Sequence, residues 1–418
     1  MTEFDYAKKK YASYGVDVEK ALERIDAIPL SVHCWQGDDV LGFEGATTLE
    51  GGIQTTGNYP GAAKGFEELK EDIRFAFKRM PGKKRLNLHA SYAVLGEDLG
   101  KIDRDGYSYR HFLPWVEFAK ELGLDGIDFN PTFFSHPKVK DGLTLSSPDE
   151  ATRSFWVSHG IRSLEIASEL GKAFGKPCFV NLWIPDGLKD VPADRFGPRL
   201  RLKQSLDEII DAPSYDRNYV RIGVESKVFG IGVESYTVGS SEFYQNYASK
   251  KGILCLMDTG HYHPTETVSD KIPALLCFYD ALALHLSRPV RWDSDHVVVL
   301  DDELKEVAKE IIRNNAESKT IIGLDYFDAS INRLSAWITG ERSVRKALLY
   351  AALLPNERLK ALQDQGRFTE LMVLQEEAKL LPFGTVYEEY LSRLGLDEHY
   401  LEECLEQEKS VLARRITK

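Results

Sequence analysis

The stretch ILCLMDTGHYH, residues 253–263, shows the pattern that decides the fold. Residues 253–257 are apolar, and a short apolar run of this kind is typical of a buried β-strand. The run ends abruptly at Asp258, and His261 follows three residues later. An apolar run that is followed directly by a carboxylate and then by an imidazole indicates that functional polar side chains lie at the ends of the strands.

Seven further runs of the same kind lie along the chain, at 28–34, 85–90, 126–129, 178–184, 219–224, 281–286 and 320–324. Between them lie segments such as 66–79, 159–174 and 302–314, in which apolar residues recur three and four positions apart. Strands that alternate with helices predict βαβ units and a parallel sheet. Eight such units predict an α/β fold closed into a (β/α)8 TIM barrel.

The character of the chain changes near residue 340. Residues 343–354, 357–381 and 400–415 are long helical patterns with no strand between them. We therefore predict a barrel with an N-terminal helix and the functional site in residues 1–340, and a C-terminal α-helical extension in residues 341–418. The extension could simply cap the barrel, but its amphipathic length favours packing against neighbouring subunits.

The composition excludes several classes of function. A net charge of -12 argues against nucleic acid as a partner, because phosphate binding needs clustered Lys and Arg. No stretch approaches the roughly 20 apolar residues of a membrane span, and the first residues lack the apolar core of a secretory signal. Five scattered cysteines fit free thiols in a reducing compartment. These features predict a cytoplasmic enzyme without a membrane partner.

Polar residues at the ends of the later predicted strands are unusually rich in carboxylates and imidazoles. They are Glu225, Lys227, Asp258, His261, His285, Asp293, Asp295 and Asp325. In a barrel of this type the functional side chains project from the carboxyl ends of the strands. Singly, each has an ordinary explanation: His285 could be a core histidine, Asp293 and Asp295 could cap a helix or form a turn, and Glu225 could pair with Lys227.

Taken together, these residues predict a metal site. Five carboxylates at one barrel mouth would repel one another unless cations neutralised them. Mixed carboxylate and imidazole ligands favour Mn²⁺, Mg²⁺ or Co²⁺. The candidates outnumber the ligands of one octahedral ion, so two ions are expected, with Asp258 best placed to bridge them. The sequence has no phosphate-binding loop, nucleophile elbow or HExxH motif, which leaves metal-assisted chemistry on a small neutral molecule.

Several longer segments resemble the bacterial L-rhamnose isomerase family nearly from end to end. They are HCWQGDD at 33–39, TTGNYPG at 55–61, RLNLHA at 85–90, NPTFFSHP at 130–137, NLWIPDG at 181–187, VESK at 224–227, SRPVRWDSDHVV at 287–298 and GLDYFDASINR at 323–333. The resemblance implies interconversion of L-rhamnose and L-rhamnulose by a homotetramer with two Mn²⁺ ions per subunit, which Co²⁺, Mg²⁺ or Zn²⁺ could replace.

The resemblance also divides the ligands between the two ions. It implies that a catalytic ion is held by His261, Asp293 and Asp295, with Asp258 shared. It implies that a structural ion is held by Glu225, Asp258, His285 and Asp325. Of two GVES copies only the first is followed by Lys, which selects Glu225 over Glu234. It further places Lys227, His89 and Trp183 around the sugar.

For the isomerisation we predict a hydride shift rather than proton transfer through an enediol. Asp325 or a metal-bound hydroxide would take the hydroxyl proton, and Lys227 would stabilise the negative charge that develops on the sugar. His89 is the candidate for opening the sugar ring. Trp183 and Phe134 offer apolar surface for the C6 methyl group, although ordinary packing explains such aromatics equally well.

Two other classes of protein stay open from the sequence. A metallohydrolase on the same barrel would use an attacking hydroxide where the isomerase binds a sugar oxygen. A sugar-binding or scaffold protein would keep the barrel without turnover. Residues 91–109 follow the second predicted strand, and one interpretation of them is a lid over the site.

Overall fold

The computed structural model describes residues 1–45, 55, 57–227, 236–263 and 265–416. Within them, eight parallel strands close into a barrel in the order β1-β10-β9-β8-β6-β4-β3-β2. The strands are β1 (Leu30–His33), β2 (Lys84–His89), β3 (Ile127–Asn130), β4 (Cys178–Trp183), β6 (Val220–Glu225), β8 (Leu254–Asp258), β9 (Leu282–His285) and β10 (Thr320–Leu324). Each coincides with a predicted apolar run, so the predicted barrel is confirmed.

Closure of the barrel depends on β1, which pairs with β10 on one side and β2 on the other. Val32 lies opposite Leu324 of β10 and Leu86 of β2. The strands are buried almost throughout because helices cover their outer faces. A separate two-stranded antiparallel sheet joins β5 (Gly187–Leu188) to β7 (Tyr236–Thr237) outside the barrel.

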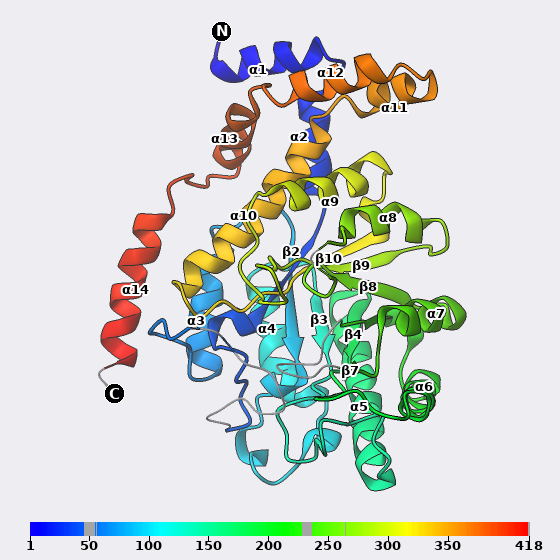
Figure 1. Cartoon of the computed structure of the whole chain (residues 1–418). Coiled ribbons are helices and arrows are strands. Elements are labelled where there is room, and N and C mark those ends of the chain that lie inside the picture. Colours follow the sequence, from blue (N-terminus) through cyan, green and yellow to red (C-terminus); the bar gives the residue numbers. More distant parts are fainter. Residues whose placement is uncertain (46–54, 56, 228–235, 264, 417–418) are drawn as a thin grey trace.

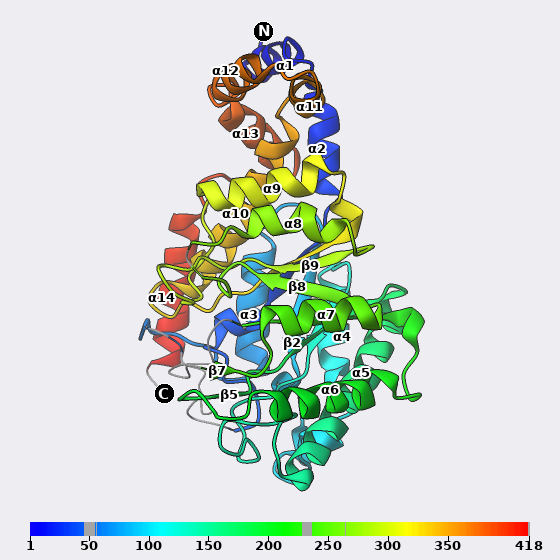
Figure 2. The same ribbon diagram turned by 45° about the vertical axis from the view of Figure 1, so that its right-hand side comes forward.

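In the part of the chain that the structure describes, eight helices form the outer ring of the barrel. They are α3 (Phe66–Phe77), α4 (Leu113–Glu121), α5 (Glu150–Phe174), α6 (Phe196–Asp211), α7 (Ser241–Lys251), α8 (Val268–Leu276), α9 (Asp302–Arg313) and α10 (Arg333–Ala352). Figure 2 shows α6 to α9 following one another along one flank. The predicted helical segments are confirmed, although α5 begins at Glu150 rather than at residue 159. Helix α9 shows the amphipathic pattern of these helices: Leu304, Val307 and Ile311, three and four positions apart, form its buried face.

The remaining helices lie outside the ring. Helices α1 (Glu3–Ala12) and α2 (Val18–Asp26) precede the barrel, and α11 (Asn356–Asp364), α12 (Phe368–Ala378), α13 (Phe383–Arg393) and α14 (Leu401–Arg415) follow it. Figure 1 shows α1, α11 and α12 gathered beyond one end of the ring, and α14 along its side. The predicted C-terminal helices are therefore present. Helix α10 runs across residue 340, so one helix belongs both to the ring and to the start of the predicted extension.

Short 3-10 turns complete the connections. They are η1 (Cys34–Gly37), η2 (Ala90–Tyr92), η3 (Gly96–Asp98), η4 (Arg104–Gly106), η5 (Tyr109–Phe112), η6 (Arg217–Tyr219) and η7 (Glu317–Lys319). Four of them, η2 to η5, structure the connection between β2 and α4 that includes residues 91–109. Among the described residues, no helix combines the length and apolar character needed to cross a membrane.

A buried ion pair fixes α10 to the opposite end of the barrel from the strand ends discussed below. Arg345 and Glu341 are fully buried, and Nε of Arg345 donates to Oε1 of Glu341 at 2.7 Å. The guanidinium also donates to the carbonyls of Ile25, Ile28 and Lys83, which lie at the end of α2 and just before β2. One side chain thus joins three segments at this end.

Replacing this arginine tests how far the ring depends on it. We expect Arg345→Met to lower the free energy of unfolding by about 3–5 kcal/mol, because Glu341 would be left as an unpaired buried charge. Arg367→Met is the matched control: its exposed pair with Glu370 should contribute less than about 1 kcal/mol. Urea unfolding followed by circular dichroism measures both, and equal midpoints for the two variants would contradict the assignment.

Candidate metal centre

The predicted ligands lie at one end of the barrel because parallel strands all end there. Glu225 ends β6, Asp258 ends β8 and His285 ends β9, while Asp325 directly follows β10. Neighbouring strands bring these positions into register, with Asp258 opposite His285. The rim that the sequence pattern predicted is therefore present in the fold.

Among the described residues, two overlapping groups of side chains are close enough to hold an ion: His33 with His285 and Asp325, and a larger group of four. Glu225, Asp258, His285 and Asp325 each offer a ligand atom, and these atoms lie within 4.8 Å of one another. Nδ1 of His285 is 3.0 Å from Oδ2 of Asp325 and 3.4 Å from Oε2 of Glu225. These are the four residues that the family resemblance assigned to the structural ion.

The other predicted ligands lie beside this group in a looser arrangement. The imidazole of His261 has Nδ1 2.9 Å from the Ser226 carbonyl, which suits an N–H donor and leaves Nε2 as the ligand atom. That Nε2 is 3.4 Å from Oδ2 of Asp293. Nζ of Lys227 also lies 2.5 Å from the same oxygen. Within the described part of the chain, His261, Asp293 and Asp295 do not form a group as close as the first.

Charge repulsion at the rim shifts several pKa values. Burial raises the pKa of Asp258 to about 7; His261 opposes this rise, and Glu225, Asp325 and Asp293 add to it. The pKa of Asp295 is raised well above its usual value by burial and by Asp293. Asp258 and Asp295 are therefore harder to ionise than isolated carboxyl groups.

The imidazoles show the complementary effect. Burial opposes protonation of His285, but the carboxylates of Glu225 and Asp325 outweigh it and hold the pKa of the imidazole well above its usual value. Burial likewise opposes protonation of His261, whose pKa is nevertheless raised to about 10, chiefly by Asp258 and Asp293. Protons on these rings supply positive charge that a bound cation would replace.

The geometry argues against three of the ordinary explanations for these residues. Within the described residues no backbone carbonyl pairs with either ring nitrogen of His285, and Nδ1 faces the carboxylates of Asp325 and Glu225 instead, so the side chain is not a core histidine satisfied by a carbonyl. Asp301, and not Asp293 or Asp295, caps the helix that follows. Lys227 pairs with Asp293 rather than with Glu225.

Two observations show that the donor set fits a divalent cation. Among the described residues, buried ligand atoms without a hydrogen bond converge on the rim, including Glu225 Oε1, Asp258 Oδ2 and Asp293 Oδ1. A Cβ atom at Gly260 would lie 2.9 Å from Asp293 Oδ1 and 3.2 Å from Asp258 Oδ1. Glycine at this position thus lets the two carboxylates approach, and oxygen and imidazole ligands of this kind suit Mn²⁺ or Mg²⁺.

The side chains predicted to surround the sugar lie on one side of the rim. His89 ends β2, and its ring centroid is 5.2 Å from that of Phe134. The ring of Phe134 lies 5.6 Å from that of Trp183 at the end of β4. Nζ of Lys227 lies 5.4 Å from the Trp183 ring centroid. The predicted residues therefore form a continuous aromatic and cationic wall.

Several neighbours of the ligands were missed in the sequence. His33 ends β1 with Nδ1 3.0 Å from Oδ1 of Asp325, and Trp35 donates to the same oxygen at 3.0 Å. Asn181 donates to Glu225, and Ser287 donates to Asp258 at 3.0 Å. His33 could have been found by applying the strand-end rule to the first strand. Asn181 lies inside an apolar run and carried no such signal. Glu234, the rejected copy of Glu225, lies outside the described residues.

The fold and this rim define a (β/α)8-barrel enzyme with a candidate divalent-metal centre. A sequence model described as L-rhamnose isomerase matches residues 1–415. An L-rhamnose isomerase of Listeria innocua is 49% identical over 417 residues, 99% of this chain and 98% of that relative. One from Mannheimia succiniciproducens is 50% identical over 416 residues, with the same coverage. The chain belongs to the L-rhamnose isomerase family.

A solved structure of L-ribulose 3-epimerase supports the fold alone. It covers 80% of this chain and 97% of its own, with a TM-score of 0.50 and 13% identity. The family membership confirms the resemblance seen in the sequence, and with it an aldose-ketose isomerase. Neither a metallohydrolase nor a non-catalytic scaffold is favoured by these findings.

Proton release on metal binding tests the centre. At pH 7 the metal-free rim holds protons on His285 and His261, whose pKa values are raised, and partly on Asp258. Ligation requires these groups without their protons, so binding of Mn²⁺ should release at least about one proton. Calorimetric titration in two buffers of different ionisation enthalpy counts it.

A matched pair of variants identifies the source of the proton. His285→Gln should reduce the count, whereas His263→Gln, at an exposed histidine bonded to Thr265, should leave it unchanged. The same binding enthalpy in both buffers would show that no proton is displaced, and the assigned ligands would then be wrong.

Proposed function

We propose that this enzyme interconverts L-rhamnose and L-rhamnulose at the barrel rim, through a hydride shift assisted by two divalent cations. One observation carries the proposal: a chain of the L-rhamnose isomerase family gathers Glu225, Asp258, His285 and Asp325 within 4.8 Å at its strand ends. The family match alone would not locate the chemistry, and the cluster alone would not choose the reaction.

We assign one cation to Glu225, Asp258, His285 and Asp325, and the other to His261, Asp293 and Asp295 with Asp258 shared. Asp258 suits a shared role, because Oδ1 accepts from Gly260 N and Ser287 Oγ whereas Oδ2 makes no hydrogen bond among the described residues. Mn²⁺ is the proposed ion, and Co²⁺, Mg²⁺ or Zn²⁺ could replace it. When bound, the cations supply Lewis acidity toward neighbouring sugar oxygens.

The chain's own residues handle protons and orientation. Asp325 receives the Trp35 N–H and faces His33 and His285. Burial raises its pKa, but the two histidines outweigh burial and bring the pKa well below its usual value, so Asp325 stays ionised. We assign the hydroxyl proton to this carboxylate from its place at the rim, because the lowered pKa by itself makes it a weaker base. Burial opposes the charge of Lys227, yet Asp293 and Asp295 raise the pKa of its ammonium, so its positive charge can stabilise negative charge on the substrate.

Ring opening and recognition are assigned to the aromatic side of the rim. Burial lowers the pKa of His89 to about 3, so its imidazole is neutral near pH 7 and can transfer a proton for ring opening. Phe134 and Trp183 provide the apolar surface on which we place the C6 methyl group.

We also propose a cytoplasmic homotetramer. All five cysteines are free, which fits a reducing compartment. Large apolar side chains are exposed in and near α12, including Phe368, Met372 and Leu380. Such a patch beyond the barrel fits contact with another subunit, and it supports the proposal that the helical extension mediates assembly.

Removal of the metal tests the proposed chemistry. Enzyme stripped with EDTA should lose ketose formation from L-rhamnose and regain it with Mn²⁺. Asp293→Asn should lower kcat/KM by at least about 100-fold, because it removes one ligand charge. Asp302→Asn is the control, since this carboxylate is fully exposed on α9 and should leave turnover unchanged. Stripped enzyme that stays inactive with added Mn²⁺ would defeat the proposal.

Solvent isotope incorporation tests the route taken by the hydrogen. In D₂O a hydride shift moves the C2 hydrogen to C1 without exchange, so the L-rhamnulose formed should carry little deuterium at C1. Mass spectrometry or proton NMR of product from a single turnover measures it, with heat-denatured enzyme as the control for non-enzymatic exchange. Substantial deuterium at C1 would instead establish proton transfer through an enediol.

A further inference from the structure

Arg104 is a buried arginine outside the metal centre whose guanidinium is completely used. Its side chain is 2% exposed. Nε and Nη2 donate to the two carboxylate oxygens of Glu44, at 2.8 and 2.6 Å. Nη1 donates to the carbonyls of Thr132 and Phe134, at 2.7 and 2.6 Å, and Nη2 donates to that of Ser135 at 3.1 Å. These contacts occupy all five N–H groups that an arginine carries.

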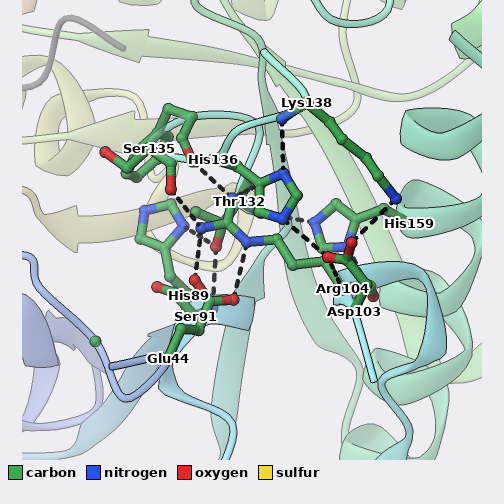
Figure 3. A network of polar contacts seen from close by, with 12 residues as sticks. Glu44, His89, Ser91, Asp103, Arg104, Thr132, Ser135, His136, Lys138 and His159 are labelled. Carbon is green, nitrogen blue, oxygen red and sulfur yellow. Dashed lines mark hydrogen bonds and ion pairs between the residues drawn. The ribbon is translucent and has the colours of Figure 1, made fainter. Parts of the chain in front are cut away.

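The contacts join three loops of the catalytic end. Glu44 follows β1, Arg104 follows β2, and residues 132–135 follow β3. Glu44 also accepts a hydrogen bond from the Tyr107 hydroxyl at 2.7 Å. Figure 3 shows Glu44 and Arg104 side by side below the turn that carries Thr132 and Ser135. The pair therefore fixes connections that the barrel strands alone would not hold together.

The turn held by Arg104 has an unusual backbone. Ser135 has φ 49°, in the left-handed region that few residues other than glycine adopt. Such a conformation persists where surrounding contacts impose it, and it is common at binding sites. Arg104 supplies three of those contacts through carbonyls at Thr132, Phe134 and Ser135.

A neutral histidine closes the network into a ring. Thr132 N–H donates to Nε2 of His159 at 3.0 Å, which leaves Nδ1 as the protonated nitrogen, 3.2 Å from the Arg104 carbonyl. Burial and the charge of Arg104 lower the pKa of His159 to about 3, so the ring stays neutral. Arg104, Thr132 and His159 thus determine one another's positions.

The turn reaches the sugar wall at two points. The hydroxyl of Thr132 accepts from Ser91 N–H at 3.1 Å and lies 3.4 Å from Nδ1 of His89. Phe134 packs edge-on against the His89 ring and against Trp183. Among the described residues, the hydrogen bonds of the Arg104 guanidinium reach Glu44 and the turn after β3 but none of the proposed metal ligands, so we expect Arg104 to affect the reaction through these side chains.

We propose that Arg104, clamped by Glu44, is a positioning residue that sets the orientation of His89 and the place of Phe134, and so governs ring opening and selectivity at the C6 end of the sugar. The inference rests on the proposed function, because it assumes that these two residues face the substrate. It adds a role for residues 91–109: part of this connection is a fixed brace behind the sugar wall.

The experiment compares Arg104→Lys with Arg345→Lys as a matched control. Both arginines are buried, pair with one glutamate and donate to three carbonyls, but Arg345 lies at the opposite end of the barrel. Lysine keeps the positive charge but lacks the planar guanidinium with its five N–H donors. Kinetic constants are measured for L-rhamnose and for L-mannose, which carries a hydroxyl on C6, and are expressed per folded molecule. Mn²⁺ affinity and thermal stability are measured in parallel.

We expect Arg104→Lys to lower kcat/KM for L-rhamnose by about 10- to 100-fold, since small misplacements of positioned groups have effects of this size. The preference for L-rhamnose over L-mannose should fall by about fivefold, because the apolar wall is displaced. Mn²⁺ affinity should stay within about twofold of wild type. Arg345→Lys should lower stability while its kinetic constants stay those of wild type.

Thr132 separates the two points of contact. Thr132→Val removes the hydroxyl near His89 and keeps the shape, so kcat should fall while the sugar preference is retained. Thr132→Ser keeps the hydroxyl and should restore kcat. If Arg104→Lys does not fold, Glu44→Gln weakens the same clamp with a smaller change and should shift the sugar preference in the same direction.

The outcomes distinguish the inference from the function on which it rests. If the wild-type enzyme does not convert L-rhamnose in the presence of Mn²⁺, the proposed function itself is wrong. A second outcome would overturn only the positioning role. In that outcome the wild-type enzyme converts L-rhamnose, while Arg104→Lys and Glu44→Gln behave like Arg345→Lys: they lose stability but keep the wild-type sugar preference.

Discussion

Mutual repulsion among buried carboxylates is the constraint around which this barrel is organised. Glu225, Asp258 and Asp325 present oxygens within 4.8 Å of one another and of His285, and because all but Asp325 are buried, water screens their charges only weakly. In the metal-free protein, protons on imidazoles and on Asp258 reduce this repulsion. A bound divalent cation would take the place of such protons, so the repulsion that destabilises the metal-free site would also contribute to metal affinity.

Such a cluster persists only on a frame that resists relaxation. The ligands sit at the ends of neighbouring strands whose registers are fixed by closure of the barrel at β1 and β10. Small residues supply the remaining space: a Cβ at Gly323 would lie 2.7 Å from the His285 ring and 3.0 Å from that of His33. At the far end, Arg345 ties α10 to the segments before β1 and β2. The rigid backbone thus holds carboxylates that repel one another in the arrangement that the proposed chemistry needs.

The sequence was informative where one rule linked pattern to position. Apolar runs predicted all eight strands, because strands buried on both faces are rich in apolar residues, and the strand-end rule brought together candidate ligands because parallel strands end together. The helical pattern alone misplaced the start of α5, whose first turns contact the loop that carries His136 and Lys138. The partnership of Arg104 with Glu44 had no signal, since residues from two irregular loops meet only after the barrel has closed.

This contrast separates two kinds of residue at the rim. Glu225, Asp258 and His285, among the side chains assigned to charge and protons, come from strand ends, where pairing with neighbouring strands fixes their backbone. The aromatic surface assigned to the sugar depends in part on a loop after β3, and a loop needs additional contacts to acquire a defined position. Arg104 supplies those contacts with five donors from one buried group. On the proposed function, a change in the loop after β3 would therefore alter selectivity while Glu225, Asp258 and His285 keep their places, because these residues are positioned by strands and not by that loop.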